Sequence, residues 1–175
     1  MIVVTNRMDA PGYDELKKLG RQVIKALQIG TSATHMEWFF GPKGLKFSEI
    51  GARPPGVGQW DLYCAANDID LYKEWALGVC HRKLDRQPSR RFATGMLALR
   101  PDRDGRIVGY ENVEILQEKF GQYVMDAHLP PAGTPTQPFE AGYMANAYVR
   151  MKHPDYDTLR EIMETIGKTL KVRAR

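Results

Sequence analysis

Two glutamates, Glu37 and Glu49, are the residues whose types and spacing best suit a chemical role in this sequence. Each lies in a run rich in strand-favouring residues, 34–40 for the first and 45–50 for the second. The Pro- and Gly-containing segment 41–44 separates the two runs. This pattern is typical of a β-hairpin, so we expect the glutamates on neighbouring strands.

The length of the turn sets the pairing within this hairpin. A three-residue loop at 42–44 would place its last glycine in the left-handed conformation that such loops need. Gly41 would then pair with Leu45, and Glu37 would fall directly opposite Glu49. Opposed side chains lie about 5 Å apart at Cβ, so the two carboxylates would be close neighbours.

Two facing carboxylates repel each other unless something offsets their charge. A divalent cation would do so, and Mg²⁺ takes carboxylate oxygens and shares them with substrate phosphates. The alternative is a solvated strand face on which Lys46 and Arg53 lie near the two glutamates. Spacing alone leaves both interpretations open.

The segment 49–58, Glu-Ile-Gly-Ala-Arg-Pro-Pro-Gly-Val-Gly, resembles the metal-binding strand and loop of the ATP-grasp superfamily. That family has one carboxylate on a strand, a hairpin turn, and then a Glu-x-Asn-x-Arg segment that leads into a glycine-rich loop. Glu37 matches the first carboxylate, Glu49 the second and Arg53 the arginine. The resemblance covers roughly residues 20–80, is weaker afterwards, and is greatest to the amino-acid ligase branch.

The sequence departs from the family pattern at one position. The metal-binding asparagine of the family falls at Gly51, which has no side chain to coordinate a metal. In the register above, His35 lies opposite Gly51 and on the same strand face as Glu37. One hypothesis is therefore that His35 fills the gap, although Mg²⁺ prefers oxygen ligands and a strand histidine more often forms hydrogen bonds.

The resemblance implies an ATP-dependent carboxylate ligase that works through an acyl phosphate, which an amine, thiol or similar nucleophile then attacks. ATP and Mg²⁺, which Mn²⁺ could replace, are the implied cofactors, and Glu37 and Glu49 are the implied metal ligands. Arg53 is the implied catalytic residue and also contacts the cofactor, because its guanidinium offers a fork of donors to phosphate or carboxylate oxygens. Gly56 and Gly58 would let the loop backbone approach the bound cofactor.

The 175 residues are enough for one domain or two small ones. We expect an α+β fold in which residues 1–85 form the C-terminal part of an ATP-grasp module. Its antiparallel sheet with flanking helices would carry the metal-binding hairpin. Residues 86–175 would form a small β-rich domain that ends in a helix, similar to the domain that follows the module in amino-acid ligases and biotin-carboxylase-like enzymes.

Hydrophobic periodicity and turn signals predict the individual elements. Helices are expected from Asp9 or Asp14 to about 28, at 60–67, 70–80 and 113–119, and from Pro154 onward. Strands are expected at 2–5, 92–99, 106–110, 123–128, 141–151 and 171–173.

A complete ATP-grasp site lies between two subdomains, and the matching motifs begin only near residue 30. We therefore expect a fragment whose missing partner is the N-terminal ATP-grasp subdomain, and which has little activity by itself. A small carboxylate such as an amino acid would be the substrate. The face that the missing subdomain leaves exposed could drive homodimerisation.

Composition limits the alternatives. The net charge is +4, and much of the excess positive charge lies at 81–91, which favours a solvated linker. Nucleic-acid binding is the competing interpretation. No aromatic residues alternate with these charges, although base stacking would need them. No apolar run approaches the roughly 20 residues that span a bilayer. Cys64 and Cys80 have no metal or redox spacing and suit reduced thiols in a core, so a cytoplasmic location is expected. Gly51 also allows a non-catalytic relative with a role in oligomerisation or regulation.

Overall fold

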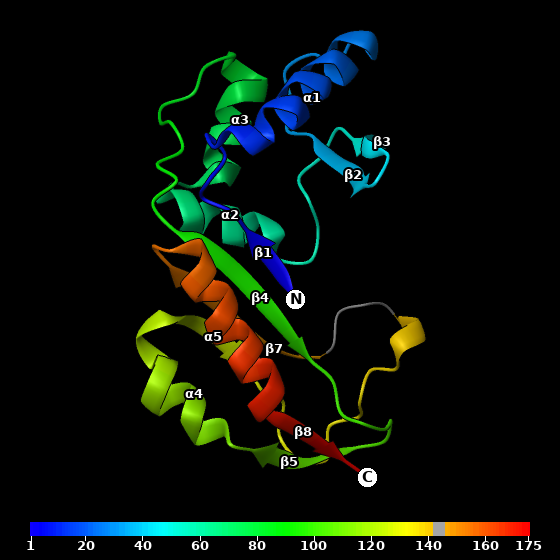
Figure 1. Cartoon of the computed structure of the whole chain (residues 1–175), viewed down its shortest axis with the longest axis vertical. Coiled ribbons are helices and arrows are strands. Elements are labelled where there is room, and N and C mark those ends of the chain that lie inside the picture. Colours follow the sequence, from blue (N-terminus) through cyan, green and yellow to red (C-terminus); the bar gives the residue numbers. More distant parts are fainter. Residues whose placement is uncertain (142–145) are drawn as a thin grey trace. The chain divides into compact units, whose positions relative to one another are not determined.

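The computed structural model describes residues 1–141 and 146–175 and divides into two compact units (Figure 1). The hairpin unit comprises residues 7–89, and the β-rich unit comprises residues 1–6 together with 90–175. The β-rich unit is thus built from both ends of the chain. The domain limits expected from the sequence, 1–85 and 86–175, stay a prediction about independently folding parts.

The hairpin unit contains three α-helices, a short 3-10 helix (Pro11–Tyr13) and a two-stranded antiparallel sheet. Its elements are α1 (Asp14–Ala26), β2 (His35–Gly41), β3 (Gly44–Gly51), α2 (Gln59–Asn67) and α3 (Leu71–His81). Asp70 caps α3, because its carboxylate accepts a hydrogen bond of 3.0 Å from the backbone N–H of Lys73.

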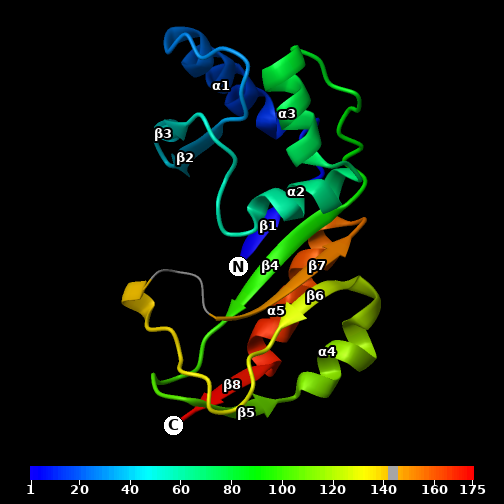
Figure 2. The same cartoon turned by 180° about the vertical axis from the view of Figure 1, so that it is seen from behind.

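The β-rich unit contains a four-stranded antiparallel sheet in the order β1-β4-β7-β6 and a separate pair, β5-β8. The two views in Figures 1 and 2 show α5 running along the sheet. The elements are β1 (Ile2–Val4), β4 (Ala93–Leu99), β5 (Ile107–Glu111), α4 (Val113–Phe120), β6 (Val124–His128), β7 (Ala147–His153), α5 (Tyr156–Thr169) and β8 (Lys171–Ala174).

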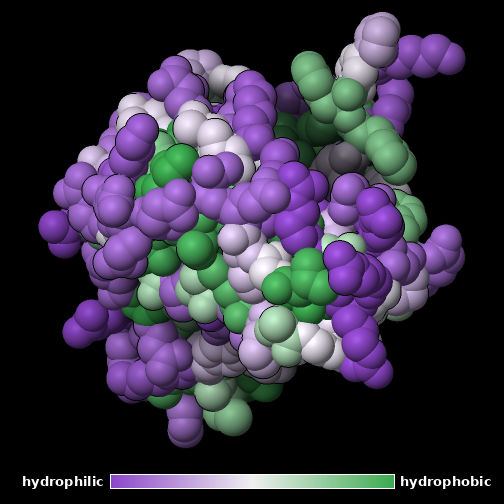
Figure 3. Space-filling view, turned by 90° about the horizontal axis from the view of Figure 1, so that it is seen from below, coloured by the Kyte–Doolittle hydropathy of each residue, from purple (hydrophilic) through white to green (hydrophobic). Residues whose placement is uncertain are grey.

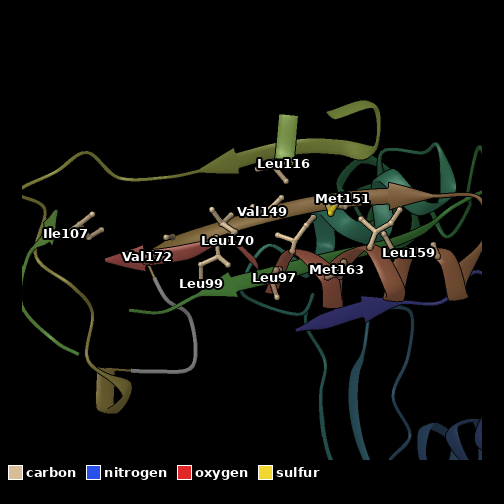
Figure 4. Packing of buried hydrophobic residues seen from close by; sticks show 14 residues of the cluster. Leu97, Leu99, Ile107, Leu116, Val149, Met151, Leu159, Met163, Leu170 and Val172 are labelled. Atoms are coloured by element: carbon tan, nitrogen blue, oxygen red, sulfur yellow. The ribbon is translucent and has the colours of Figure 1, made fainter. Parts of the chain in front are cut away.

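The core of the β-rich unit lies between α5 and the sheet. Alternate residues of the strands point toward the helix, and Figure 4 shows Leu97 and Met151 meeting Leu159 and Met163 of α5. The side chains of Met151, Leu159 and Met163 are fully buried. Asp155 starts the helix by accepting a hydrogen bond of 2.8 Å from the N–H of Thr158.

The expected α+β class is confirmed, and most of the expected elements are present. The long strand expected at 141–151 is wrong at its start, because residues 139–141 form a 3-10 turn and β7 begins at Ala147. The part of that expectation at 142–145 lies outside the described residues.

The expected burial of the two cysteines is wrong, and the apolar face of one helix is also less buried than its pattern would suggest. Helix α1 is strongly amphipathic, yet none of its residues is buried. Of the two cysteines that were expected in a core, Cys64 is half-buried and Cys80 is exposed. The N–H of Leu71 donates to the sulfur of Cys64 at 3.4 Å, and burial raises the pKa of this thiol.

One face of the molecule is mainly polar. On the face shown in Figure 3, hydrophilic side chains dominate and apolar groups emerge between them. Within the part of the chain that the structure describes, every helix is too short or too polar to cross a bilayer.

Candidate metal and phosphate site

The hairpin places Glu37 opposite Glu49, as expected from the sequence. His35 also pairs with Gly51 as expected. Glu37 and Glu49 are both exposed. The two residues therefore lie opposite each other on neighbouring strands, and both are accessible from solvent.

The turn that produces this pairing differs from the expected one. Gly41 pairs with Gly44 and not with Leu45, so the turn has two central residues, Pro42 and Lys43. Gly44 has a φ of 76°, a left-handed conformation that glycine adopts without strain. With this turn alone, the register would miss the glutamate pair by one residue.

A β-bulge restores the register. Trp38 pairs with Phe47 and Glu37 pairs with Glu49, so Ser48 is an extra residue on β3. The rings of Trp38 and Phe47 pack edge to face at 5.3 Å between centroids, which anchors the strands directly beside the bulge. The bulge thus places Glu49, rather than Ser48, opposite Glu37.

The charge of the glutamate pair is not balanced within the described residues. Neither Glu37 nor Glu49 forms an ion pair or a side-chain hydrogen bond with any residue in the ranges 1–141 and 146–175. Like charges that face each other on a sheet are destabilising. A cation placed between the two carboxylates would offset this repulsion.

Arg53, four residues after Glu49, forms no ion pair with either glutamate. Its guanidinium donates to the carbonyl oxygen of Pro54 at 2.9 Å, and the side chain is exposed. The stem of Arg53 lies over Gly51, because a β-carbon added at Gly51 would be 3.3 Å from its Cγ and 3.4 Å from its Nε. The missing side chain at Gly51 thus gives Arg53 its room.

The loop after Arg53 is strained. Val57 and Gly58 have consecutive left-handed φ values of 59° and 69°. A β-branched residue with positive φ is rare and costs of order 1–3 kcal/mol, so the surrounding structure must enforce it. Gly58 then starts α2 with no side-chain cap, and no heavy atom lies within 4 Å of the place where a β-carbon of Gly56 would be. Backbone groups of the loop are therefore open to a ligand.

The hypothesis that His35 joins the metal ligands gains no support. Among the described residues, no three or more His, Cys, Asp or Glu side chains gather closely enough to hold a metal ion. A cation on this hairpin would therefore receive two carboxylates from the chain and its other ligands from phosphate or water. Mg²⁺ is commonly bound in this way, so the residues present fit it.

Sequence patterns gave no sign of two features of this site. The bulge at Ser48 leaves no mark in the sequence, because its neighbours are ordinary strand residues. The left-handed conformation of Val57 could not be predicted from the sequence either, since valine normally favours extended backbone.

Comparison with known proteins shows which fold carries this site. No protein-family model matches the sequence, and no curated protein matches it. Among solved structures, the chain resembles an L-amino acid ligase from Bacillus licheniformis with a TM-score of 0.74 and 14% identity. That match covers 91% of this chain and 40% of the ligase.

Two further solved structures resemble the chain. One is a phosphoribosylglycinamide synthetase from Anaerococcus prevotii, with a TM-score of 0.66, 12% identity, and coverage of 91% of this chain and 41% of that one. The other is an N5-carboxyaminoimidazole ribonucleotide synthetase from Thermotoga maritima, with a TM-score of 0.60, 17% identity, and coverage of 94% and 44%. All three are ATP-grasp enzymes, so the resemblance noted in the sequence is confirmed at the level of fold. The chain spans less than half the length of each.

Proposed function

We propose that this chain is the metal-binding and substrate-contacting portion of an ATP-dependent carboxylate–amine or carboxylate–thiol ligase. The observation that carries the proposal is the unneutralised pair Glu37 and Glu49, held opposite each other by a bulged hairpin. An arginine and a strained loop follow the pair directly. The ATP-grasp fold of the similar structures supports the proposal, but the main support comes from the residues of the site.

Glu37 and Glu49 would hold Mg²⁺ or Mn²⁺ through oxygens on both strands of the hairpin. When bound with ATP, the ion supplies charge neutralisation for the phosphoryl group in transfer. The contribution of the chain is geometric. The bulge and the edge-to-face pair of Trp38 and Phe47 hold the two carboxylates at one place on the hairpin.

Arg53 would bind an oxygen of the transferred phosphoryl group or of the substrate carboxylate. In the absence of a ligand it donates only to Pro54, one residue away, and a charged acceptor would compete well for this exposed guanidinium. Gly56 and Gly58 would allow the loop backbone to approach the same ligand. The reaction would convert a small carboxylate, such as that of an amino acid, into an acyl phosphate for attack by the nucleophile.

The remaining nucleotide contacts would come from an N-terminal ATP-grasp subdomain, either in the same polypeptide or as a partner. This part of the proposal accords with the coverage of only 40–44% of the three similar enzymes. Weak nucleotide affinity is the corollary for the 175 residues alone.

A second candidate function has its own supporting observation. Gly51 removes the side chain with which the family binds metal, and Arg53 lies over the space. This arrangement favours a non-catalytic relative whose hairpin has lost metal binding and serves assembly or regulation.

Calorimetric titration of the chain with Mg²⁺-ADP and Mg²⁺-ATP separates the two. The first proposal expects weak binding that requires Mg²⁺ and is lost in Glu37→Gln and in Glu49→Gln. Glu114→Gln, at an exposed position of α4, is the matched control and should bind as the wild type does. Binding that ignores both hairpin substitutions would refute the assigned metal ligands, and identical weak binding without metal would favour the second candidate.

A further inference from the structure

The hairpin unit contains a pocket of about 360 Å³ that the proposed ligase chemistry does not use. It lies among α2, α3, the segment 31–33 and the segment 82–88 that follows α3, elements that can be followed in Figure 1. None of Glu37, Glu49 and Arg53 lines it. Its volume falls at the lower end of the range for small-molecule sites.

The walls of the pocket are mainly apolar. The apolar residues that line it include Trp60, Ile69, Leu71, Trp75 and Val79. Val79 is half exposed although it is aliphatic, so part of the wall faces solvent. Such a surface favours an occupant with an apolar body.

Both indole N–H groups of these walls lack an acceptor. Nε1 of Trp60 and Nε1 of Trp75 are buried and form no hydrogen bond in the part of the chain that the structure describes. A buried donor without a partner costs about 1–3 kcal/mol. A ligand oxygen that reached either N–H group would remove this cost.

The rim of the pocket is cationic. Arg82, Lys83 and Arg86 all line it, and all three side chains are exposed. Lys83 lies 3.7 Å from a carboxylate oxygen of Asp85, but the guanidinium groups of Arg82 and Arg86 form no ion pair with any described residue. The rim therefore has two uncommitted cations beside an apolar cavity.

The segment that carries the rim is held in place by a buried acid. Glu74 of α3 is only 5% exposed, and its Oε2 accepts hydrogen bonds from the backbone N–H of Asp85 at 2.8 Å and of Arg86 at 3.4 Å. The charge of Glu74 is thus already solvated by backbone donors, and the rim is pre-organised.

We propose that this pocket binds a small amphipathic carboxylate, with its apolar body between Trp60 and Trp75 and its carboxylate at Arg82 and Arg86. The lining selects the body, and the uncommitted guanidinium groups select an anionic head over a neutral or cationic one. Because this site involves neither Mg²⁺ nor ATP, it stands or falls separately from the ligase proposal.

The test uses the indole N–H signals of the whole chain in ¹⁵N-labelled protein. The chain has three tryptophans, and Trp38 lies on the hairpin outside the pocket, where its signal serves as an internal reference. Phenylbutyrate is the probe, with phenylbutanol and phenylbutylamine as neutral and cationic matches. Trp60→Phe and Trp75→Phe assign the signals.

Phenylbutyrate at millimolar concentration should shift the signals of Trp60 and Trp75 and leave that of Trp38 in place. The double substitution Arg82→Gln and Arg86→Gln should weaken binding by roughly tenfold or more, as the loss of charge-assisted hydrogen bonds predicts. Val79→Phe should abolish binding by filling the pocket from its exposed wall. Arg103→Gln, an exposed arginine of the β-rich unit, is the control and should leave the affinity unchanged.

Three results would overturn the proposal. One is the absence of indole shifts with phenylbutyrate while the protein remains folded. Another is equal or tighter binding of the alcohol or the amine. With the alcohol, this result would mean that the cationic rim plays no part in recognition; with the amine, it would mean that Glu74 recognises the ligand. The last is the same indole shifts on raising protein concentration without ligand, which would make a second copy of the chain the occupant.

Discussion

The paired glutamates make the metal-free hairpin less stable than its aromatic contacts would allow. We predict that Glu37→Gln stabilises metal-free protein by up to about 1 kcal/mol, because it removes the repulsion across the strand pair. Urea unfolding followed by Trp fluorescence measures this change, since Trp38 is the next residue on β2.

Added Mg²⁺ should reverse the order of the two proteins. The wild type should gain stability as the ion binds the pair, whereas Glu37→Gln should gain little. If the substitution destabilises the hairpin in metal-free buffer, another group must already balance the charge of Glu49.

Substitutions at Gly51 test whether this hairpin is an active metal site or one that has lost metal binding. A β-carbon here would press on the stem of Arg53 at 3.3 Å, so Gly51→Ala and Gly51→Asn should both displace that arginine. Only the asparagine adds a carbonyl oxygen beside Glu49. We predict that Gly51→Asn raises Mg²⁺-nucleotide affinity several-fold over Gly51→Ala, as measured by calorimetry. Equal affinities would mean that the oxygen of the asparagine does not reach the metal.

The residue types of this site could be predicted from the sequence, but its local geometry could not. Glu37 and Glu49 were expected to pair, and they do. The expected loop was wrong, and a bulge at Ser48 compensated for it, so the right pairing followed from the wrong turn. Turn type depends on the backbone of four residues, and several turns suit the same Pro-Lys-Gly sequence.

At the scale of elements, a bidentate ion pair links strand β5 to strand β8. Nε and Nη2 of Arg173 both donate to the carboxylate of Glu111 at 2.7 Å. Hydrogen bonding from Arg173 lowers the pKa of Glu111. Because the pKa of Glu111 is lowered, the ion pair stabilises the folded state at pH values above the ordinary pKa of a glutamate. This stabilisation is lost as the pH falls through the lowered pKa.

We predict that Arg173→Gln raises the pKa of Glu111 toward that of an ordinary glutamate. Titration of the Glu111 carboxyl ¹³C signal by NMR in both proteins measures the shift. Arg160→Gln, whose arginine pairs with Glu164 on α5, is the control and should leave the pKa of Glu111 unchanged. An unchanged pKa of Glu111 in Arg173→Gln would show that this ion pair does not persist in solution.

The contact between α5 and β4 depends on a glycine. A β-carbon at Gly95 would overlap the sulfur of Met163, which is fully buried, and would lie 3.1 Å from the carbonyl oxygen of Ile2. We predict that Gly95→Ala lowers the free energy of unfolding by roughly 1–3 kcal/mol. Gly109→Ala in β5 is the control, because no atom lies within 4 Å of its added carbon. Equal losses in urea unfolding would show that the helix shifts freely to accommodate the carbon.

Elements with a strong local signal could be predicted well. Helix α5 has the cap Asp155 and a periodic apolar stripe, and it is present near its expected limits. Helix α1 was equally periodic, yet its stripe is only half-buried. Periodicity identifies the face of a helix, but burial depends on which partner covers that face, and this information is not local.

At the scale of the molecule, the hairpin unit is an insertion between two paired strands. Val4 of β1 pairs with Thr94 of β4, and Nδ2 of Asn6 donates to the carbonyl oxygen of Pro154 at 2.8 Å. The core cluster of the β-rich unit draws all of its buried residues from positions 93–172. The sequence did not indicate this arrangement, because three apolar residues at 2–4 do not specify which strand they join.

We predict that the β-rich unit folds when residues 7–89 are replaced by a Gly/Ser linker of roughly eight residues, a length that spans neighbouring strand ends. Far-UV circular dichroism should show one cooperative thermal transition. The same protein without residues 1–6 is the comparison and should be less stable, because it lacks β1. Failure of the linked protein to unfold cooperatively would mean that the β-rich unit requires the hairpin unit.

The split origin of the four-stranded sheet also sets an order of events on the ribosome. Strand β1 is synthesised before β4, its neighbour in the sheet among the described residues, which follows about 90 residues later. At roughly 5–20 residues per second, the nascent β1 waits about 5–20 s for its partner. During that interval its Ile-Val-Val segment is an unpaired strand that other chains could capture, so the exposure of β1 lasts as long as the synthesis of the inserted hairpin unit.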